Sequence, residues 1–142
     1  MRPIRLIRRL ILHLARQWKA ASLQRLSPGA ARRLEDLRQL RHELQERFAQ
    51  PWTLEEMTRR VHLGASRFLR LYREFFGVTP VQDLIEFRIQ AARRMLDTGA
   101  ATVGEVAEAC GFGSLQHFSR FFKRRVGHAP SQYRQTLASR AW

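Results

Sequence analysis

The chain has 142 residues and a formal net charge of +14, because 26 Lys and Arg residues face only 12 Asp and Glu residues. This length holds one ordinary domain, or one domain and an arm, and a hydrophobic fraction of 44% excludes disorder throughout the chain. A single cysteine excludes an internal disulfide framework and fits a reducing cytoplasm, and no apolar run reaches the length of a membrane span. Of the basic residues 24 are Arg, whose planar guanidinium grips phosphates and base edges with two bonds, so the charge favours a nucleic-acid partner.

The first predicted helix covers residues 4–24 and is basic and amphipathic. Residues 1–34 carry nine basic side chains and no acidic one. Apolar residues three and four positions apart form one stripe: Ile4, Ile7, Ile11, Leu14 and Trp18. We assign residues 1–27 to this element and keep three interpretations of it. It is a helix that forms a homodimer, a helix that docks on the rest of the chain, or a basic arm that lies on DNA or a membrane surface. A membrane is the least favoured of these partners.

A second helix is predicted to follow at 28–48. Ser27 can cap it, and Pro28 fits its first turn. Its inward residues are expected to be Leu34, Leu37, Leu40, Leu44 and Phe48. Pro51 ends the helix, and we expect the main domain to extend over residues 28–142.

From Thr53 onward the sequence repeats itself with a shift of 49 and then 50 positions. Each copy opens with a capping box, in which Thr53 pairs with Glu56 and Thr102 pairs with Glu105. A glycine-containing turn, a second helix, a glycine and a proline follow in both copies, and in the second copy Ser114 can cap the second helix. The pattern predicts two helix-turn-helix units, at about 53–76 and 102–126, joined by a connecting helix at 80–97. The expected fold is therefore all-α.

The connecting helix has its own start signals and its own buried face. Thr79 is the predicted cap, Pro80 takes the first position, and Gln82 completes a third capping box. Six residues are expected to face the core: Leu84, Ile85, Ile89, Ala92, Met95 and Leu96.

In each predicted unit the second helix has one aromatic face and one polar face. The aromatic residues follow core spacing, so we expect packing rather than base stacking from Phe68, Leu71, Tyr72, Phe75 and Phe76, and from Phe118, Phe121, Phe122 and Val126. The polar face of such a helix enters the major groove of DNA.

Six polar side chains on these faces are given specific roles. Arg70, Arg120 and Gln116 are the predicted base readers, because Arg pairs bidentately with guanine and Gln with adenine. Arg73, Lys123 and Arg124 stand about one turn later along their helices. We predict that these three hold phosphates.

Residues 53–134 also resemble the DNA-binding domain of the AraC/XylS family of bacterial transcription regulators. The strings that carry the resemblance are Gly77–Pro80, Arg88 with Ala92–Leu96, Val103–Phe112, His117–Arg125 and Gly127–Arg134. The resemblance implies seven helices, with two recognition helices in adjacent major grooves on one face of the DNA. By motif position it implies base-facing roles for Ser66, Arg67, Leu69 and Arg70 in the first unit, and for Leu115, Gln116, His117, Ser119 and Arg120 in the second.

The first unit departs from the family pattern at three positions. Gly64 stands where the family often has a capping Ser, and Thr58 stands where it has a small Ala. Leu69 can touch a thymine methyl but cannot form a hydrogen bond to a base. We therefore expect the first unit to tolerate more sequences or to prefer A·T steps, while the second follows the family pattern more closely.

Together these features predict a sequence-specific transcription regulator of the bacterial cytoplasm, associated with the nucleoid. Its predicted partner is double-stranded DNA, with RNA polymerase and a second copy bound through residues 4–24 as further candidates. The alternative is a non-specific basic protein that binds nucleic acid through charge alone.

Enzymatic activity is not predicted, and neither a cofactor nor a metal is expected. The five His residues show no metal spacing, and Cys110 falls on the apolar face of a helix. Gly111 and Gly113 bracket a turn without the Lys-Ser/Thr that a phosphate loop needs.

Overall fold

The computed structural model describes residues 10–11, 13–17 and 26–140. The chain divides into two units, residues 1–36 and 37–142. In the first unit residues 10–11 and 13–17 are helical, and Leu10, Ile11 and Leu14 are exposed. The rest of the predicted helix at 4–24 lies outside the described residues. The boundary at residue 27 between arm and domain therefore stays a prediction.

Helix α2 (Pro28–Glu46) begins as the sequence predicts and ends slightly earlier. The Ser27 hydroxyl accepts a hydrogen bond from the Ala30 amide at 3.3 Å, which caps the helix. The sequence places the end of this helix at about Phe48, but α2 ends at Glu46. Phe48 instead lies half-buried in the turn that follows α2. The difference has a tertiary cause, because the side chain of Arg88, in the connecting helix, donates a hydrogen bond to the carbonyl oxygen of Phe48.

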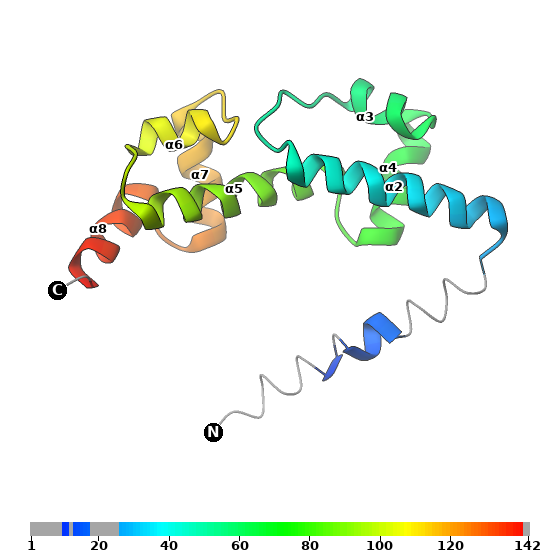
Figure 1. The fold of residues 1–142 in the computed structure, drawn as a ribbon, viewed down its shortest axis with the longest axis horizontal. Helices are drawn as coiled ribbons and strands as arrows, with labels where there is room; N and C mark the ends of the chain where they lie inside the picture. Colours follow the sequence, from blue (N-terminus) through cyan, green and yellow to red (C-terminus); the bar gives the residue numbers. More distant parts are fainter. Residues whose placement is uncertain (1–9, 12, 18–25, 141–142) are drawn as a thin grey trace. The chain divides into compact units, whose positions relative to one another are not determined.

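The second unit continues with six helices and, among the described residues, has no strand. They are α3 (Leu54–Val61), α4 (Ala65–Phe76), α5 (Pro80–Thr98), α6 (Val103–Ala109), α7 (Leu115–Val126) and α8 (Pro130–Arg140). Figure 1 shows α3 and α4 gathered near the start of α5, and α6, α7 and α8 around its end. The all-α prediction and the two helix-turn-helix units joined by one helix are confirmed.

The helix starts follow from local sequence. Thr53, Thr79 and Thr102 each accept a hydrogen bond from the amide three residues later, and the side chain at that position accepts one from the Thr amide. All three predicted capping boxes are therefore present. Each stabilises its helix by satisfying amides that have no partner inside the helix, with a typical value of about 1 kcal/mol.

Two apolar clusters form the core of residues 37–142, one for each helix-turn-helix unit. The first contains the buried side chains of Leu37, Leu40, Leu44, Met57, Val61, Phe68, Tyr72 and Leu84. The second contains those of Ile89, Ala91, Ala92, Leu96, Val106, Ala107, Cys110, Phe118 and Phe122. Since α5 contributes to both clusters, it joins the two helix-turn-helix units through packing as well as through the backbone. No helix among the described residues is long and apolar enough to cross a bilayer.

Candidate nucleic-acid interface

Helix α4 presents the two faces that the sequence predicts. Phe68 and Tyr72 are fully buried, and the Tyr72 ring meets the Phe76 ring edge to face with centroids 4.6 Å apart. Leu71, Phe75 and Phe76 are half-buried beside the same core. The opposite face leaves four predicted DNA-binding side chains exposed: Ser66, Arg67, Arg70 and Arg73. Helix α4 thus uses its aromatic residues for packing, and its polar residues remain accessible.

Helix α7 repeats this arrangement in the second helix-turn-helix unit. The Ser114 hydroxyl accepts a hydrogen bond from the His117 amide at 3.3 Å, which confirms the predicted cap. Phe118 and Phe122 are buried, and their rings pack 5.6 Å apart. Six of the predicted DNA-binding side chains are exposed: Leu115, Gln116, His117, Arg120, Lys123 and Arg124. Ser119 is half-buried, so it has less room than its neighbours to reach a base.

Predicted contact residues from the two helices meet in two depressions beside α5. Leu69 of α4 and His117 of α7 line the same depression, of about 270 Å³. Arg73 of α4 and Arg124 of α7 line a second one, of about 410 Å³. Two residues with base-facing positions implied by the resemblance therefore line one depression, and two predicted phosphate ligands line the other. Leu69 is half-buried against the first core, which leaves only part of it available to a thymine methyl.

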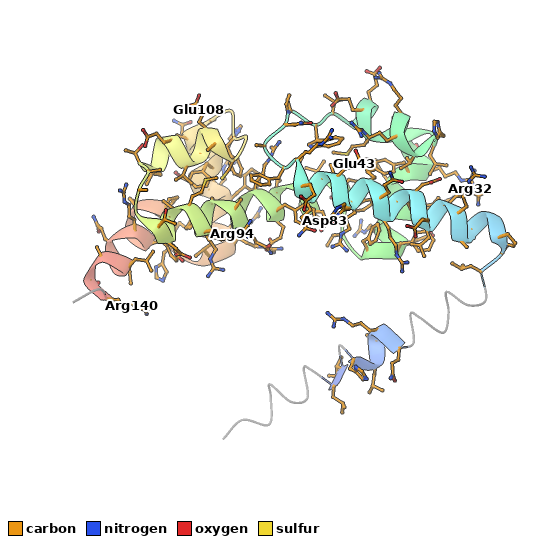
Figure 2. All side chains as sticks on the ribbon, viewed as in Figure 1. Arg32, Glu43, Asp83, Arg94, Glu108 and Arg140 are labelled. Atoms are coloured by element: carbon orange, nitrogen blue, oxygen red, sulfur yellow. The ribbon has the colours of Figure 1, made fainter. Side chains whose placement is uncertain are left out.

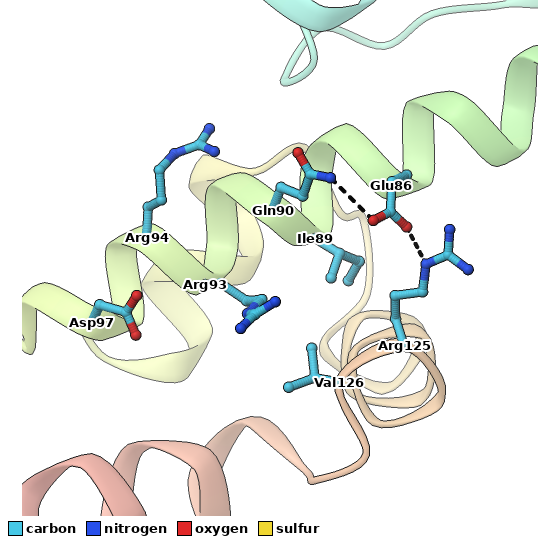
Figure 3. Close-up of a pocket in the computed structure, with 8 residues that line it drawn as sticks. All are labelled: Glu86, Ile89, Gln90, Arg93, Arg94, Asp97, Arg125 and Val126. Carbon is cyan, nitrogen blue, oxygen red and sulfur yellow. Dashed lines mark hydrogen bonds and ion pairs between the residues drawn. The ribbon is translucent and has the colours of Figure 1, made fainter. Parts of the chain in front are cut away.

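The cations on the predicted reading surface are not used in ion pairs within the described part of the chain. The four ion pairs found there join Arg41 to Asp83, Arg59 to Glu55, Arg60 to Glu43 and Arg125 to Glu86. Figure 3 shows the last of these, in which Arg125 of α7 turns toward Glu86 of α5. Arg125 is thus paired with α5, whereas its neighbour Arg124 forms no ion pair among the described residues and is available to bind DNA.

The buried carboxylate of Asp83 contacts the core-facing side of α4 and was not predicted from the sequence. Asp83 of α5 accepts hydrogen bonds from the Tyr72 hydroxyl at 2.6 Å and from Nε and Nη2 of Arg41 at 2.8 and 3.2 Å. Figure 2 shows Asp83 on the stretch of α5 beside α2. The Arg41 guanidinium also lies 4.7 Å from the centroid of the Phe76 ring. This network ties α2, α4 and α5 together.

Tyr72 is the donor that completes this network. Burial raises the pKa of the Tyr72 hydroxyl, and the hydrogen bond to Asp83 raises it further. The hydroxyl therefore stays protonated and donates its hydrogen bond at any physiological pH. No local signal marks Asp83, because an acid in the first turn of a helix is ordinarily explained by the helix dipole.

The environment of Cys110 fits a packing role. Its side chain is buried, and its sulfur lies 3.8 Å from the sulfur of Met95. Burial raises the pKa of the Cys110 thiol to about 11, although the nearby charges of Arg88 and Arg94 oppose the shift. Among the described residues, no three His, Cys, Asp or Glu side chains gather as a metal site would require.

We expect Cys110 to react with a maleimide about 100-fold more slowly at pH 8 in the folded protein than in the unfolded chain. The reason is that the thiolate is the reactive form, and its pKa rises from 9.0 to about 11 on folding. For the same reason the thiol favours the folded state below pH 9, and this contribution is lost as the pH rises toward 11. Mass spectrometry of timed samples with and without urea measures the rates directly. Equal rates would contradict the buried position.

Comparison with known proteins gives a consistent result. Residues 57–136 match the family model of the helix-turn-helix domain. The virulence regulon transcriptional activator VirF of Yersinia enterocolitica is 31% identical over 93 residues, which are 66% of this chain and 34% of that protein. The transcriptional activator RhaS of Salmonella schwarzengrund is 33% identical over 110 residues, 78% of this chain and 40% of that protein. The chain thus spans well under half the length of these relatives.

Solved structures share the fold. The DNA-binding domain of AdpA, a global transcriptional factor crystallised with a target DNA, superimposes with a TM-score of 0.70 at 31% identity. The match covers 73% of this chain and 94% of that domain. A probable AraC family transcriptional regulator from Rhodopseudomonas palustris gives a TM-score of 0.67 at 27% identity, covering 72% of this chain and 97% of that one.

Proposed function

The chain belongs to the AraC/XylS family of helix-turn-helix transcription regulators, and from this premise we propose that it binds specific sites on double-stranded DNA and regulates transcription there. In this proposal α4 and α7 enter two adjacent major grooves about one helical turn apart. The main support for this proposal is that α4 and α7 each expose one polar face and bury a pair of aromatic residues on the opposite face. The buried aromatic face of such a helix fixes its position in the fold, and its exposed polar face is free to contact DNA.

The exposed side chains have two different roles in DNA binding. Arg70, Arg120 and Gln116 read base edges, while Arg73, Lys123 and Arg124 hold the backbone. The absence of ion pairs at these cations, among the described residues, supports this assignment, because no intramolecular contact must be broken before DNA binds. The half-buried position of Leu69 favours a weaker contribution from the first unit at that base.

A selection from randomised oligonucleotides with the full chain tests the proposal. A sequence-specific regulator enriches one site with two conserved segments about ten base pairs apart. The alternative, a basic protein that binds nucleic acid through charge alone, enriches no sequence and shows a steep salt dependence. Failure to enrich any sequence at moderate salt would overturn the proposal in favour of that alternative.

Replacing the base readers is expected to change specificity as well as affinity. Arg70→Ala and Arg120→Ala should each weaken binding to the selected site by about 1–3 kcal/mol and relax the preference at one position of the site. Repeating the selection with each variant measures both effects. Equal losses on the selected site and on random DNA would remove the base-reading role from that residue.

Two charge-matched variants serve as controls for the base readers. Arg124→Ala should weaken binding to all sequences alike and lower the slope of log K against log salt by about one. Arg59→Ala removes the same charge from α3, where Arg59 pairs with Glu55 at 3.2 Å and is not one of the predicted DNA contacts. Its effect on DNA binding should be the smallest of the four variants.

Three further elements of the same proposal concern partners and location. A regulator that activates transcription contacts RNA polymerase, and we include the polymerase as a partner. Residues 4–24 are proposed to pair with a second copy of the chain, since Leu10, Ile11 and Leu14 are exposed. Sedimentation of the full chain, with and without Leu14→Glu, tests the pairing. The site of action is the nucleoid of a bacterial cytoplasm, where the DNA lies.

A further inference from the structure

The connection between α2 and α3 leads into the first helix-turn-helix and is held by a side chain of α5. The Arg88 guanidinium donates one hydrogen bond from Nε to the carbonyl oxygen of Phe48 at 2.7 Å, and another from Nη2 to that of Gln50 at 2.8 Å. A planar group that binds two carbonyls two residues apart fixes both the position and the rotation of the segment between them.

The same segment touches the turn of the second helix-turn-helix. Gly111 lies in that turn with φ +83°, and a Cβ placed on it would lie 2.6 Å from the carbonyl oxygen of Ala49. It would also lie 3.0 Å from the Ala49 carbonyl carbon and Cα. The two backbones are thus as close as a residue without a side chain allows.

Two aromatic side chains extend this contact. Phe48 packs against both apolar clusters, so it lies where the two cores meet. The Arg88 guanidinium lies 5.9 Å from the centroid of the Phe112 ring, which follows Gly111 in the turn. Burial also lowers the pKa of the Arg88 guanidinium, as expected for a cation held inside the fold. One arginine therefore contacts both the segment that leads into the first helix-turn-helix and the turn of the second.

We propose that Arg88 and Gly111 form an inter-unit clamp on residues 48–50 that fixes the distance and rotation between α4 and α7, and so sets the half-site spacing that the protein accepts on DNA. The clamp rests on the proposed function, in which α4 and α7 read two half-sites. One additional base pair moves the second half-site by about 3.4 Å along the DNA and rotates it by about 35°. A rigid pair of recognition helices cannot follow that movement, whereas a pair with a loosened connection can.

The test uses the full chain and operators in which the selected half-sites are separated by one base pair fewer, the selected number, or one more. For the wild-type protein, either change in spacing should lower affinity by about 30-fold or more. For Arg88→Ala the same changes should cost less than about fivefold. Arg88→Lys keeps the charge but loses the planar two-donor fork, so it should also lose the spacing preference.

Arg94→Ala is the matched control for this experiment. It removes one Arg charge from the same helix, and the exposed Arg94 side chain points away from Arg125 of α7 in Figure 3. Its spacing preference should equal that of the wild-type protein. A DNA that carries a single half-site completes the set, because a folded variant with a loosened clamp binds it as the wild-type protein does.

The outcomes separate the two proposals. Wild-type spacing preference in both Arg88→Ala and Arg88→Lys would overturn the clamp and leave the proposed function standing. A wild-type protein that binds the selected operator no better than random DNA would overturn the proposed function, and the clamp with it. Loss of spacing preference in the Arg88 variants, with retention in Arg94→Ala, is the supporting result.

Discussion

Gly111→Ala is expected to lower the free energy of unfolding by about 2–5 kcal/mol, from two separate costs. A residue with a Cβ is strained at φ +83°, which costs about 1–2 kcal/mol. The added carbon also lies 2.6 Å from the Ala49 carbonyl oxygen, so two backbone segments must separate, at a further cost of about 1–3 kcal/mol. Urea unfolding followed by circular dichroism measures the change.

Gly77→Ala isolates the first of these costs. Gly77 has φ +77° at the end of α4, but a Cβ placed there meets no atom within 4 Å. It should therefore lose only about 1–2 kcal/mol from backbone strain. Equal losses for Gly77→Ala and Gly111→Ala would show that the close approach to Ala49 adds nothing to stability.

Comparison of the two turns explains why glycine is needed in one and not in the other. His62 occupies the position that corresponds to Gly111, and it also has a positive φ, of 53°. Its side chain is exposed, so it bears backbone strain without a steric clash. At position 111 the close approach of Ala49 thus adds a steric cost to the backbone strain, whereas at His62 only the strain applies.

Asp83→Ala is expected to destabilise the protein by about 2–4 kcal/mol. It leaves the buried Tyr72 hydroxyl without its acceptor, and it removes the partner of Arg41. The estimate lies below the full value for a broken buried ion pair because the Arg41 side chain is 40% exposed, so water can solvate it in part. Urea unfolding of the variant and the wild-type protein gives the difference.

Two further variants make the Asp83 prediction specific. Adding Tyr72→Phe to Asp83→Ala removes the unsatisfied hydroxyl and should recover part of the loss. Asp97→Ala removes an acid from the same helix whose hydrogen bond, from the Tyr133 hydroxyl at 2.6 Å, is exposed. That variant should lose no more than about 1 kcal/mol. Equal losses at Asp83 and Asp97 would contradict a supporting role for the buried network.

Most of the fold follows from short-range patterns. The caps at Ser27, Thr53, Thr79, Thr102 and Ser114 are all confirmed, because a cap depends only on residues within one helical turn. The aromatic faces of α4 and α7 are also confirmed as core, since helical periodicity fixes which residues share a face. The predicted DNA contacts are found mostly exposed, and their roles stay predictions.

Sequence patterns alone predict the repeat, the helices from α2 to α7 and the two polar faces, whereas α8 is implied only by the family resemblance. The helices and their faces depend on residues that lie within a few positions of one another. Three features depend on tertiary contacts that the sequence patterns did not predict. Asp83 is buried beneath α4, α2 ends before Phe48, and Arg88 holds the connection between α2 and α3. These contacts join residues about 40 positions apart or link separate helices, and neither periodicity nor capping specifies which partners meet at that separation.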